Sequence, residues 1–191
     1  MRSARGASAK DANRVRIIGG AWRSRVIRFA PHRALRPTPD RVRETLFNWL
    51  GQDLSGTACL DLYAGSGALG FEAASRGARR VVMVEHAVEI YRALESTRTM
   101  LNAAAVELVK ADALEFLHGN SGRYDIVFLD PPFQAAYWPR LLGSLPARLN
   151  TGALVYCESA APFELPAGWE VRKQSRAGQV CYQLVQRAEH E

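Results

Sequence analysis

Two kinds of hydrophobic pattern alternate along the chain from residue 57 onward. Short, nearly continuous apolar runs such as D-I-V-F-L-D predict strands that are buried on both faces of a parallel sheet. Longer stretches with apolar residues at every third or fourth position predict helices. The predicted strands are 57–63, 80–85, 106–110, 124–130, 153–158, 169–174 and 180–186, and the predicted helices are 68–76, 87–103, 113–117 and 138–149. The alternation predicts a doubly wound α/β fold, and the last two strands, joined only by a short link at Ala177-Gly178, predict an antiparallel hairpin at one edge.

The residues before this region follow different patterns. Residues 1–13 are polar and aperiodic, which predicts a disordered tail. Two short runs in which arginine alternates with apolar residues flank Gly19-Gly20, and this pattern predicts a β-hairpin within 14–35 that carries guanidinium groups on one face. After two prolines, Thr38 or Asp40 is expected to cap a helix that ends before Gly51. Residues 36–191 would then form the main domain.

The composition limits the classes of protein that the chain can be. With 191 residues, of which 48% are hydrophobic, it can form one domain with a substantial core. No apolar run approaches the roughly 20 residues of a membrane span, and the basic, polar start is unlike a secretory signal. Cys59, Cys157 and Cys181 are far apart and form no C-x-x-C pair, which indicates buried, reduced thiols rather than disulfides or metal ligands. We therefore expect a cytoplasmic protein without a metal.

Positive charge is concentrated at the N-terminal end. The net charge is +6, but residues 1–43 hold 12 of the 25 Lys and Arg residues and only two acids, which gives +10 for this segment and −4 for the remainder. Eleven of those 12 bases are arginine, whose planar guanidinium suits forked contacts with phosphate. The asymmetry indicates either a polyanionic partner such as nucleic acid or a solvated basic tail.

A glycine-rich segment, D-L-Y-A-G-S-G-A-L-G from Asp61 to Gly70, lies between a predicted strand and a predicted helix. Gly65, Gly67 and Gly70 fit G-x-G-x-x-G, a loop pattern that several nucleotide cofactors share. Glu85 ends the next strand, 18 residues after Gly67, where an acid can accept hydrogen bonds from the two ribose hydroxyls of a nucleoside. A dinucleotide such as NAD and S-adenosylmethionine both fit this much of the pattern.

Asp61 favours S-adenosylmethionine over a dinucleotide. Its carboxylate stands four residues before the first glycine, where it would repel a pyrophosphate but attract the amine and sulfonium of S-adenosylmethionine. Asp112, after the third strand of the region, suits a contact to the adenine amine. Each acid also has a purely structural interpretation: Asp61 as a loop cap, Glu85 as a surface acid, and Asp112 as the N-cap of a helix at Ala113. Together, at the ends of three successive strands, they indicate a cofactor site.

The segment F-L-D-P-P-F places Asp130 at the end of the fourth strand, which lies next to the first in the usual doubly wound order. Pro131 and Pro132 fix φ and stiffen the turn, and Phe133 offers a flat surface on which a base can stack. A carboxylate and a main-chain carbonyl can each accept one N–H of a nucleobase amine and aim its lone pair at a methyl donor. The alternative is a tight turn with Phe133 in the core.

These motifs resemble those of a known family. Asp61–Gly70 and Asp130–Phe133 resemble motifs I and IV of class I methyltransferases that act on exocyclic amines. Together with R-P-T-P-D-R-V-R-E-T-L-F-N-W-L and A-G-Q-V-C-Y-Q-L, they resemble the RsmD family, bacterial enzymes that methylate N2 of one guanine (family position 966) in 16S ribosomal RNA. The resemblance extends from about Val15 to Arg187. It implies a Rossmann-like sheet of seven mostly parallel strands with an antiparallel last strand, helices on both faces, and the hairpin as an N-terminal extension.

The resemblance also implies roles for individual residues. The amine-binding and stacking residues would be Asp130, Pro131 and Phe133. S-adenosylmethionine would be bound by Asp61, Gly65, Gly67, Glu85, Asp112, Ala113 and Thr38, the last of these in a segment from Arg36 that closes over the site. RNA would contact Arg16, Arg23, Arg25, Arg28, Arg36 and Arg41. Pro39 stands where the family pattern has Thr, and Tyr63 occupies a variable site; neither changes the expected chemistry.

Three other functions share part of this pattern. A DNA adenine-N6 or cytosine-N4 methyltransferase would use the same D-P-P-F turn, and only the R-P-T stretch and the basic hairpin favour ribosomal RNA. An NAD-dependent oxidoreductase would use the glycine loop but leaves Asp130 and the arginines without a role. A non-catalytic RNA-binding protein would not need the intact acids. We expect a monomer that acts on the small ribosomal subunit or its assembly intermediate, because a chain of this size reads little RNA shape alone.

Overall fold

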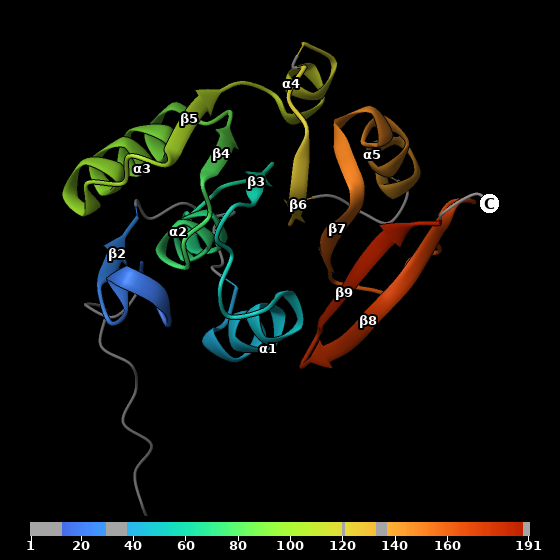
Figure 1. The fold of residues 1–191 in the computed structure, drawn as a ribbon, viewed down its shortest axis with the longest axis horizontal. Helices are drawn as coiled ribbons and strands as arrows, with labels where there is room; N and C mark the ends of the chain where they lie inside the picture. The colour runs from blue at the N-terminus through green and yellow to red at the C-terminus, as the bar shows by residue number, and fades with distance from the viewer. Residues whose placement is uncertain (1–12, 30–37, 120, 133–136, 189–191) are drawn as a thin grey trace, which may run out of the picture.

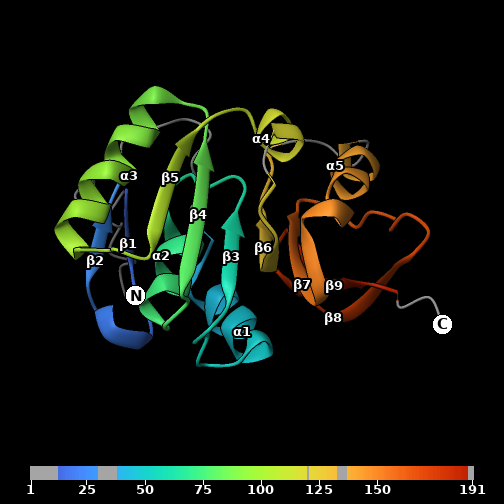
Figure 2. The same ribbon diagram turned by 45° about the horizontal axis from the view of Figure 1, so that its top comes forward.

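The computed structural model describes residues 13–29, 38–119, 121–132 and 137–188. Its centre is a seven-stranded sheet in the order β5-β4-β3-β6-β7-β9-β8 (Figures 1 and 2). The strands are β3 (Ala58–Asp61), β4 (Arg80–Glu85), β5 (Val106–Lys110), β6 (Tyr124–Leu129), β7 (Leu149–Ser159), β8 (Trp169–Ala177) and β9 (Val180–Arg187). Strands β3 to β7 are parallel, and β9 runs antiparallel to both of its neighbours. The predicted fold class, including the antiparallel hairpin at one edge, is therefore confirmed.

Helices cover both faces of this sheet, and each face buries its own apolar cluster (Figure 2). The helices of one face are α1 (Asp40–Leu50), α2 (Ala68–Ser75) and α3 (Val88–Leu101), and those of the other are α4 (Ala113–Gly119) and α5 (Trp138–Ser144). On the first face, the rings of Phe47 and Phe128 lie 6.1 Å apart. On the second, Leu117 and Leu141 join Val127 in the buried cluster. Strands β3, β4 and β6 are thus covered on both sides, which explains their continuous apolar sequences.

A short hairpin precedes this domain. It consists of β1 (Arg14–Arg16) and β2 (Val26–Arg28), with a 3-10 turn, η1 (Gly20–Trp22), in between. Val15 and Ile27 pair with each other and are buried against the first face of the sheet. The arginines of both strands are exposed, as the alternating pattern predicts. The remainder of the predicted hairpin span, 30–35, and residues 1–12 of the predicted disordered tail lie outside the described residues.

A buried carboxylate attaches this hairpin to two helices. Glu72 of α2 accepts hydrogen bonds from the N–H groups of Ile18, at 2.9 Å, and Gly19, at 2.8 Å. Its oxygens also lie 3.3 Å from Nη1 of Arg43 and 2.9 Å from Nη2 of Arg76. The side chains of Glu72 and Arg43 are completely buried. One carboxylate therefore connects the hairpin, α1 and α2, and its charge is matched by two guanidinium groups.

The turn of the hairpin lies against the end of α2. Ser75 Oγ donates a hydrogen bond to the Gly19 carbonyl at 2.6 Å and accepts one from the Trp22 N–H at 2.9 Å. Gly20, with φ +71°, approaches so closely that a Cβ there would lie 1.8 Å from the Ser75 carbonyl oxygen. Because α2 runs back from the carboxyl edge of the sheet, this turn lies toward the amino edge.

Several predicted element boundaries differ from the structure by one to three residues, and the boundaries of α5 and β7 differ most. The helix predicted over 138–149 ends at Ser144 and is followed by a second 3-10 turn, η3 (Pro146–Arg148), because Pro146 has no N–H to continue the helical hydrogen bonds. Strand β7 begins at Leu149, four residues before the predicted start at Ala153. Pairing of Leu149 with Tyr124 extends the strand through a polar segment whose sequence gives no strand signal.

The predicted cap of α1 was also wrong. Pro39 occupies the N-cap position, and neither Thr38 nor Asp40 makes a side-chain capping hydrogen bond. Asp40 is instead the first helical residue, and the Thr38 hydroxyl has a partner elsewhere. The predicted end is confirmed, since α1 stops at Leu50 and Gly51 follows with φ +97°.

The cysteines are free thiols, as predicted. Cys59 and Cys157 are buried, and Cys181 is half-buried. Burial raises the pKa of Cys59 to about 12, which keeps this thiol protonated. Within the described ranges, none of the helices is both long enough and apolar enough to cross a bilayer.

Candidate cofactor and base-binding site

Four acids meet at the carboxyl edge of the sheet. Asp61 ends β3, Glu85 ends β4, and Asp130 directly follows β6. The strands β3, β4 and β6 are neighbours in parallel register, so these three side chains lie at one edge. Glu158, the next to last residue of β7, is the fourth acid of this edge. Two of the three predicted cofactor acids, Asp61 and Glu85, therefore lie at the same edge as the predicted amine-binding acid, Asp130.

The glycine loop is held by two of these carboxylates. Asp61 Oδ2 accepts a hydrogen bond from the Gly70 N–H at 2.9 Å, and Glu85 Oε2 accepts one from the Gly65 N–H at 3.1 Å. Gly65 has φ +50°, and Gly67, the N-cap of α2, has φ +78°. The loop thus needs glycine at both positions, and the acids that are predicted to bind cofactor also orient the loop that would surround it.

We expect Gly67→Ala to weaken S-adenosylmethionine binding by about tenfold or more. An added Cβ would lie 2.6 Å from the ring of Phe71, in a backbone conformation that alanine rarely adopts, so the loop must move. The matched control is Gly143→Ala in α5, where no atom lies within 4 Å of the added Cβ. Isothermal titration calorimetry on both variants checks this expectation. Equal affinities in the two variants would show that the loop shape does not govern cofactor binding.

Burial raises the pKa of Asp61 to about 7. The hydrogen bond from Gly70 opposes this rise, and the negative charge of Glu85 adds to it. An ionised carboxylate at this position is therefore costly until a positive charge comes near it. A cationic ligand would remove this cost, which fits the sulfonium and amine of S-adenosylmethionine better than the pyrophosphate of a dinucleotide.

Asp130 is half-buried at the same edge. Burial raises the pKa of its carboxyl group well above the ordinary value, and the charges of Glu158 and Asp61 raise it further. Pro131 is buried and Pro132 is exposed, so only the second proline of the turn after β6 faces solvent. The predicted stacking residue Phe133 lies outside the described residues.

Sequence reasoning missed the role of Glu158. Its Oε2 accepts hydrogen bonds from Thr38 Oγ1 at 3.1 Å and from the Tyr156 hydroxyl at 2.8 Å. Burial raises the pKa of Glu158, and the hydrogen bonds from Tyr156 and Thr38 oppose the rise. The signal was available, because an acid at the carboxyl end of a parallel strand follows the same rule that selected Asp61 and Glu85. Through this contact Thr38, the residue before the N-cap of α1, is joined to the edge that carries Asp130.

The remaining predicted cofactor residues lie at the end of β5. Asp112 is exposed, and its Oδ1 accepts hydrogen bonds from the N–H groups of Leu114, at 2.8 Å, and Glu115, at 3.1 Å. Asp112 is therefore the N-cap of α4, the structural role that the sequence analysis gave as the alternative to cofactor binding. Ala113 beside it is buried. Its contact with an adenine amine stays a prediction.

A contact between two tyrosines connects the glycine loop with the segment after D-P-P-F. The hydroxyl of Tyr63, just after β3, lies 3.4 Å from that of Tyr137. Tyr137 immediately precedes α5, whose first residue, Trp138, is buried. This contact joins the start of the glycine-rich segment to the residue that precedes α5.

The structure separates the predicted RNA-binding arginines into two groups. Arg16 and Arg41 are both exposed. They lie near the start of α1: Arg41 is in its first turn, and the Arg43 guanidinium donates to the carbonyls of Arg16, at 2.9 Å, and Thr38, at 3.2 Å. The second group of exposed arginines comprises Arg23, Arg25 and Arg28. Of these, Arg23 and Arg25 follow the turn that lies against the end of α2, toward the amino edge. Arg36 lies outside the described residues.

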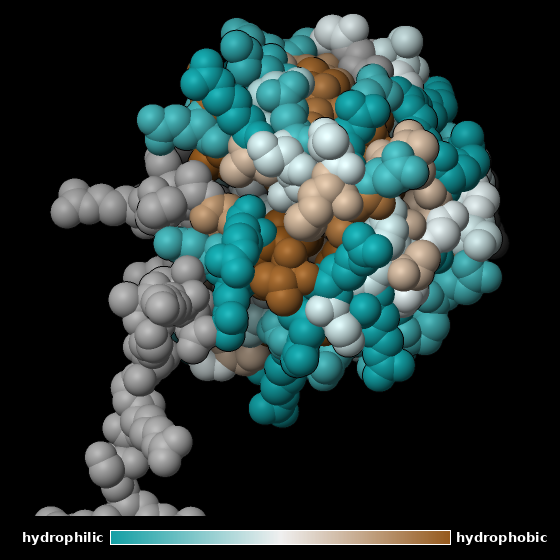
Figure 3. Space-filling view, turned by 90° about the vertical axis from the view of Figure 1, so that its left-hand side faces the viewer, coloured by the Kyte–Doolittle hydropathy of each residue, from teal (hydrophilic) through white to brown (hydrophobic). Residues whose placement is uncertain are grey.

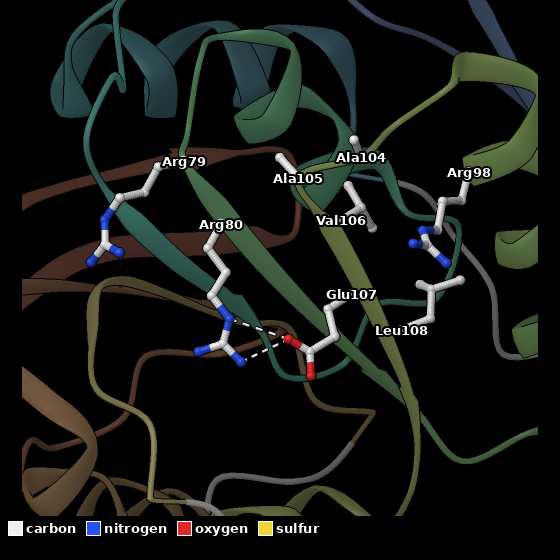
Figure 4. A pocket seen from close by; sticks show the side chains of 8 residues that line it. All are labelled: Arg79, Arg80, Arg98, Ala104, Ala105, Val106, Glu107 and Leu108. Atoms are coloured by element: carbon white, nitrogen blue, oxygen red, sulfur yellow. Dashed lines mark hydrogen bonds and ion pairs between the residues drawn. The ribbon is translucent and has the colours of Figure 1, made fainter.

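The surface around the hairpin is mixed in character. Figure 3 views the side of the molecule that holds α3 and the hairpin, and hydrophilic side chains there surround a hydrophobic patch. A cavity of about 460 Å³ lies at the amino ends of β4 and β5, bordered by Arg79, Arg80 and Arg98 (Figure 4). The Arg80 guanidinium points to Glu107 and lies 2.7 Å from its carboxylate. This cavity is at the opposite edge from the acids and takes no part in their site.

In the part of the chain that the structure describes, no group of three His, Cys, Asp or Glu side chains is arranged to hold an ion.

The fold and this edge define a class of protein. A seven-stranded sheet of this order, with a glycine loop after β3 and acids at the ends of β3 and β4, is the fold of class I methyltransferases. The putative methyltransferase yhhF from Escherichia coli has a matching structure, with a TM-score of 0.82 and 40% sequence identity. The match covers 93% of this chain and 99% of that chain.

Within this class, the chain belongs to the RsmD family. The family model described as conserved hypothetical protein 95 matches residues 15–186. The chain is 40% identical over 181 residues to ribosomal RNA small subunit methyltransferase D of Escherichia coli (strain K12), which covers 92% of this chain and 91% of that protein. It is 38% identical over 180 residues to the protein of the same name in Haemophilus influenzae, covering 90% and 93% of the two chains. The predicted family is confirmed.

Proposed function

We propose that this chain transfers a methyl group from S-adenosylmethionine to the exocyclic N2 amine of a guanine in the 16S RNA of the small ribosomal subunit. The observation that carries the proposal is the position of Asp130, beside the glycine loop and at the edge where Asp61 and Glu85 end their strands. The names of the family relatives, which are ribosomal RNA small subunit methyltransferases, support the choice of RNA.

The residues present fit S-adenosylmethionine. Asp61 holds a buried carboxylate whose pKa burial raises to about 7, and a cationic ligand would stabilise its ionised form. Glu85 is buried at the end of β4, where its carboxylate would accept hydrogen bonds from ribose hydroxyls. Asp112 and Ala113 would contact the adenine ring. When bound, S-adenosylmethionine supplies a methyl group on a positively charged sulfur.

The residues of the D-P-P-F turn would position the base. The lone pair of the guanine N2 amine is delocalised into the ring, so the amine is a weak nucleophile. The Asp130 carboxylate and the Pro131 carbonyl would each accept one amine N–H, which holds the nitrogen with its lone pair directed at the methyl group. The Asp130 charge would stabilise the positive charge that develops on nitrogen and accept the proton that the nitrogen releases. Phe133 would replace part of the stacking that the base loses on leaving the RNA.

Binding of S-adenosylmethionine should depend on pH through Asp61. The carboxyl group of Asp61 has a pKa of about 7 in the folded protein, above its ordinary value of 3.8. The folded protein therefore binds more protons than the unfolded chain between these values, and this group's contribution to stability falls as pH rises through that window. Because the positive cofactor favours the ionised form, we expect its affinity to rise with pH up to about 7 and then level off.

The expected pH dependence is checked by calorimetric titration of S-adenosylmethionine into the wild-type protein and Asp61→Asn at pH values between the two pKa values of Asp61. The asparagine variant should bind more weakly and lose the pH dependence. A variant that retains the same pH dependence would assign the titration to another group.

RNA binding should depend most on the arginines near the R-P-T segment. We propose that residues 14–35 form an RNA-contacting extension of the catalytic domain, 36–191. Replacing Arg16 and Arg41 with alanine should reduce the salt dependence of RNA affinity by about one unit of slope for each phosphate that is no longer neutralised. The matched pair is Arg23→Ala with Arg25→Ala, which removes the same charge further from the carboxylates. Filter binding at several salt concentrations measures both, and equal changes in slope would contradict the expectation that Arg16 and Arg41 contribute more than Arg23 and Arg25. Replacing Arg28 in addition tests whether β2 contacts RNA as well.

Three alternative functions make different demands on the site. A DNA adenine-N6 or cytosine-N4 methyltransferase would use the same geometry, but the family relatives do not favour it. An NAD-dependent oxidoreductase would have to bind a pyrophosphate beside the Asp61 carboxylate. A non-catalytic RNA-binding protein would tolerate loss of Asp130.

The test uses S-adenosylmethionine with a labelled methyl group. It is offered with unmethylated small ribosomal subunits, free 16S RNA and duplex DNA, and the labelled nucleoside is identified after digestion. We expect N2-methylguanosine from the subunits, consistent with a monomer that works in the bacterial cytoplasm on an assembled or assembling particle. Label in N6-methyladenine or N4-methylcytosine would retain the mechanism and overturn the substrate. Transfer to none of the three would refute the proposal.

A further inference from the structure

A groove of about 440 Å³ lies at the carboxyl edge, beyond the end of β7. This volume falls within the range of roughly 300–1,000 Å³ that is common for small-molecule sites. The groove is enclosed by the loop after β7, which includes Phe163, and by the β8–β9 hairpin. Ser159 lines it and directly follows Glu158. The groove therefore adjoins the edge that carries Asp130.

Strand register shows which side chains form the floor of the groove. Ser159 of β7 pairs with Cys181 of β9, and Cys181 pairs with Arg176 of β8, so these three residues form one row across the sheet. Gln183 and Gln174 also pair directly and form the next row. Residues two apart on a strand share a face, so both rows lie on the same face. All five residues line the groove.

The wall of the groove connects it to the D-P-P-F turn. The ring of Phe163 stacks on that of Trp138, with centroids 4.2 Å apart and planes 5° from parallel. Trp138 begins α5, the first helix after the D-P-P-F turn. Phe163 thus packs on the helix that follows the D-P-P-F turn in the chain.

The chemistry of the lining fits RNA. None of the described lining residues is acidic, and two adjacent amides, Gln174 and Gln183, offer both donors and acceptors to a base edge. Strand β8 is almost wholly exposed and carries Arg172, Lys173 and Arg176 against one acid, Glu170. Arg176 is exposed, and its Nε donates to the Gly178 carbonyl at 2.8 Å, which orients the guanidinium. This strand lies on the opposite side of the molecule from the N-terminal hairpin (Figures 1 and 2).

We propose that this groove binds one unpaired nucleotide of the RNA next to the target guanine, an inference that rests on the proposed function. The two glutamines contact the edge of its base, Phe163 contacts its apolar surface, and Arg176 binds its phosphate. A guanine that leaves its stack requires neighbouring nucleotides that are unstacked too, and sequence-specific recognition of RNA uses such bases. Binding in the groove would let the enzyme recognise the RNA sequence next to the methylated guanine.

The test is the double variant Gln174→Ala/Arg176→Ala, in which both replaced side chains are exposed. We expect the KM for RNA to rise about tenfold, while kcat at saturating RNA and the affinity for S-adenosylmethionine stay unchanged. The second measurement replaces each nucleotide beside the target guanine, one at a time, with an abasic nucleotide. For the wild-type protein one such replacement should raise KM about tenfold, and the same replacement should add little in the double variant.

The matched control is Lys173→Ala, which removes a positive charge from the same strand on the other face. Its pairing with Leu184 places it one position beyond the row of Gln174 and Gln183, on the opposite face of the strand, and it does not line the groove. If Lys173→Ala raises KM as much as the double variant, general attraction explains the effect and the groove proposal is overturned. It is also overturned if the wild-type protein methylates guanine and the double variant keeps its KM. If the wild-type protein transfers no methyl group to RNA, the proposed function fails first and this inference fails with it.

Discussion

Asp130→Ala should lower kcat for methyl transfer by about 10²–10³, the decrease that follows removal of one preorganised electrostatic interaction with a transition state. The carboxylate is proposed to bind the amine N–H, stabilise the positive nitrogen and accept its proton, and alanine does none of these. The affinity for S-adenosylmethionine should change by less than about threefold, because Asp61 and Glu85 remain in place. Single-turnover methyl transfer and calorimetry on the same preparation measure the two quantities.

Two controls make this expectation specific. Asp130→Asn retains an oxygen that accepts one N–H but loses the charge, so its rate should lie between those of the wild-type protein and the alanine variant. In the wild-type protein, the rate should rise with pH through the raised pKa of Asp130, because only the ionised carboxyl group acts. Cofactor affinity that falls in parallel with kcat would assign Asp130 to the cofactor site instead.

Glu72→Ala should reduce the free energy of unfolding by about 3–5 kcal/mol, the usual cost of removing one partner of a buried ion pair. The variant leaves the completely buried guanidinium of Arg43 without this carboxylate. It also leaves the N–H groups of Ile18 and Gly19 without the acceptor that holds the hairpin. Urea denaturation followed by circular dichroism measures the destabilisation, and limited proteolysis should cut the hairpin faster than the rest of the chain.

The matched control is Glu107→Ala, which removes the carboxylate of an exposed ion pair with Arg80. An exposed pair contributes about 0–1 kcal/mol, so this variant should unfold close to the wild-type midpoint. Similar destabilisation in both variants would mean that burial of the Glu72 network does not determine its contribution.

Much of the fold follows from local signals along the chain. The boundaries of β4 and β5 were predicted to the residue: in β4 a continuous apolar run is bounded by Arg80 and Glu85, and in β5 the apolar residues from Val106 end at Lys110. The boundaries of α5 and β7 were wrong, because Pro146 ends a helix whose apolar pattern continues, and pairing with β6 extends a strand through polar residues. Local pattern therefore locates β4 and β5 better than α5 and β7, whose lengths depend on a proline and on pairing with a neighbouring strand.

The residues of the candidate site also separate into those that local sequence predicts and those that it does not. Asp61, Glu85 and Asp130 were predicted because each stands at the end of an apolar run, and parallel strands bring their carboxyl ends to one edge. Thr38 was expected to cap a helix and instead binds Glu158, 120 residues away in the sequence. No local pattern contains that contact.

By itself, the sequence determined the α/β class, the glycine loop, the acids of the carboxyl edge and the family, because periodicity, turn residues and motif spacing are local properties of the chain. Only the tertiary structure decided that Glu72 joins the hairpin to two helices, that Glu158 lies beside Asp130, and that Arg16 and Arg41 lie nearer the site than Arg23 and Arg25. It alone shows the groove that the loop after β7 and the β8–β9 hairpin enclose. The physical reason is that burial, charge pairing and strand register depend on residues that are distant in sequence, whose positions are set when the chain packs.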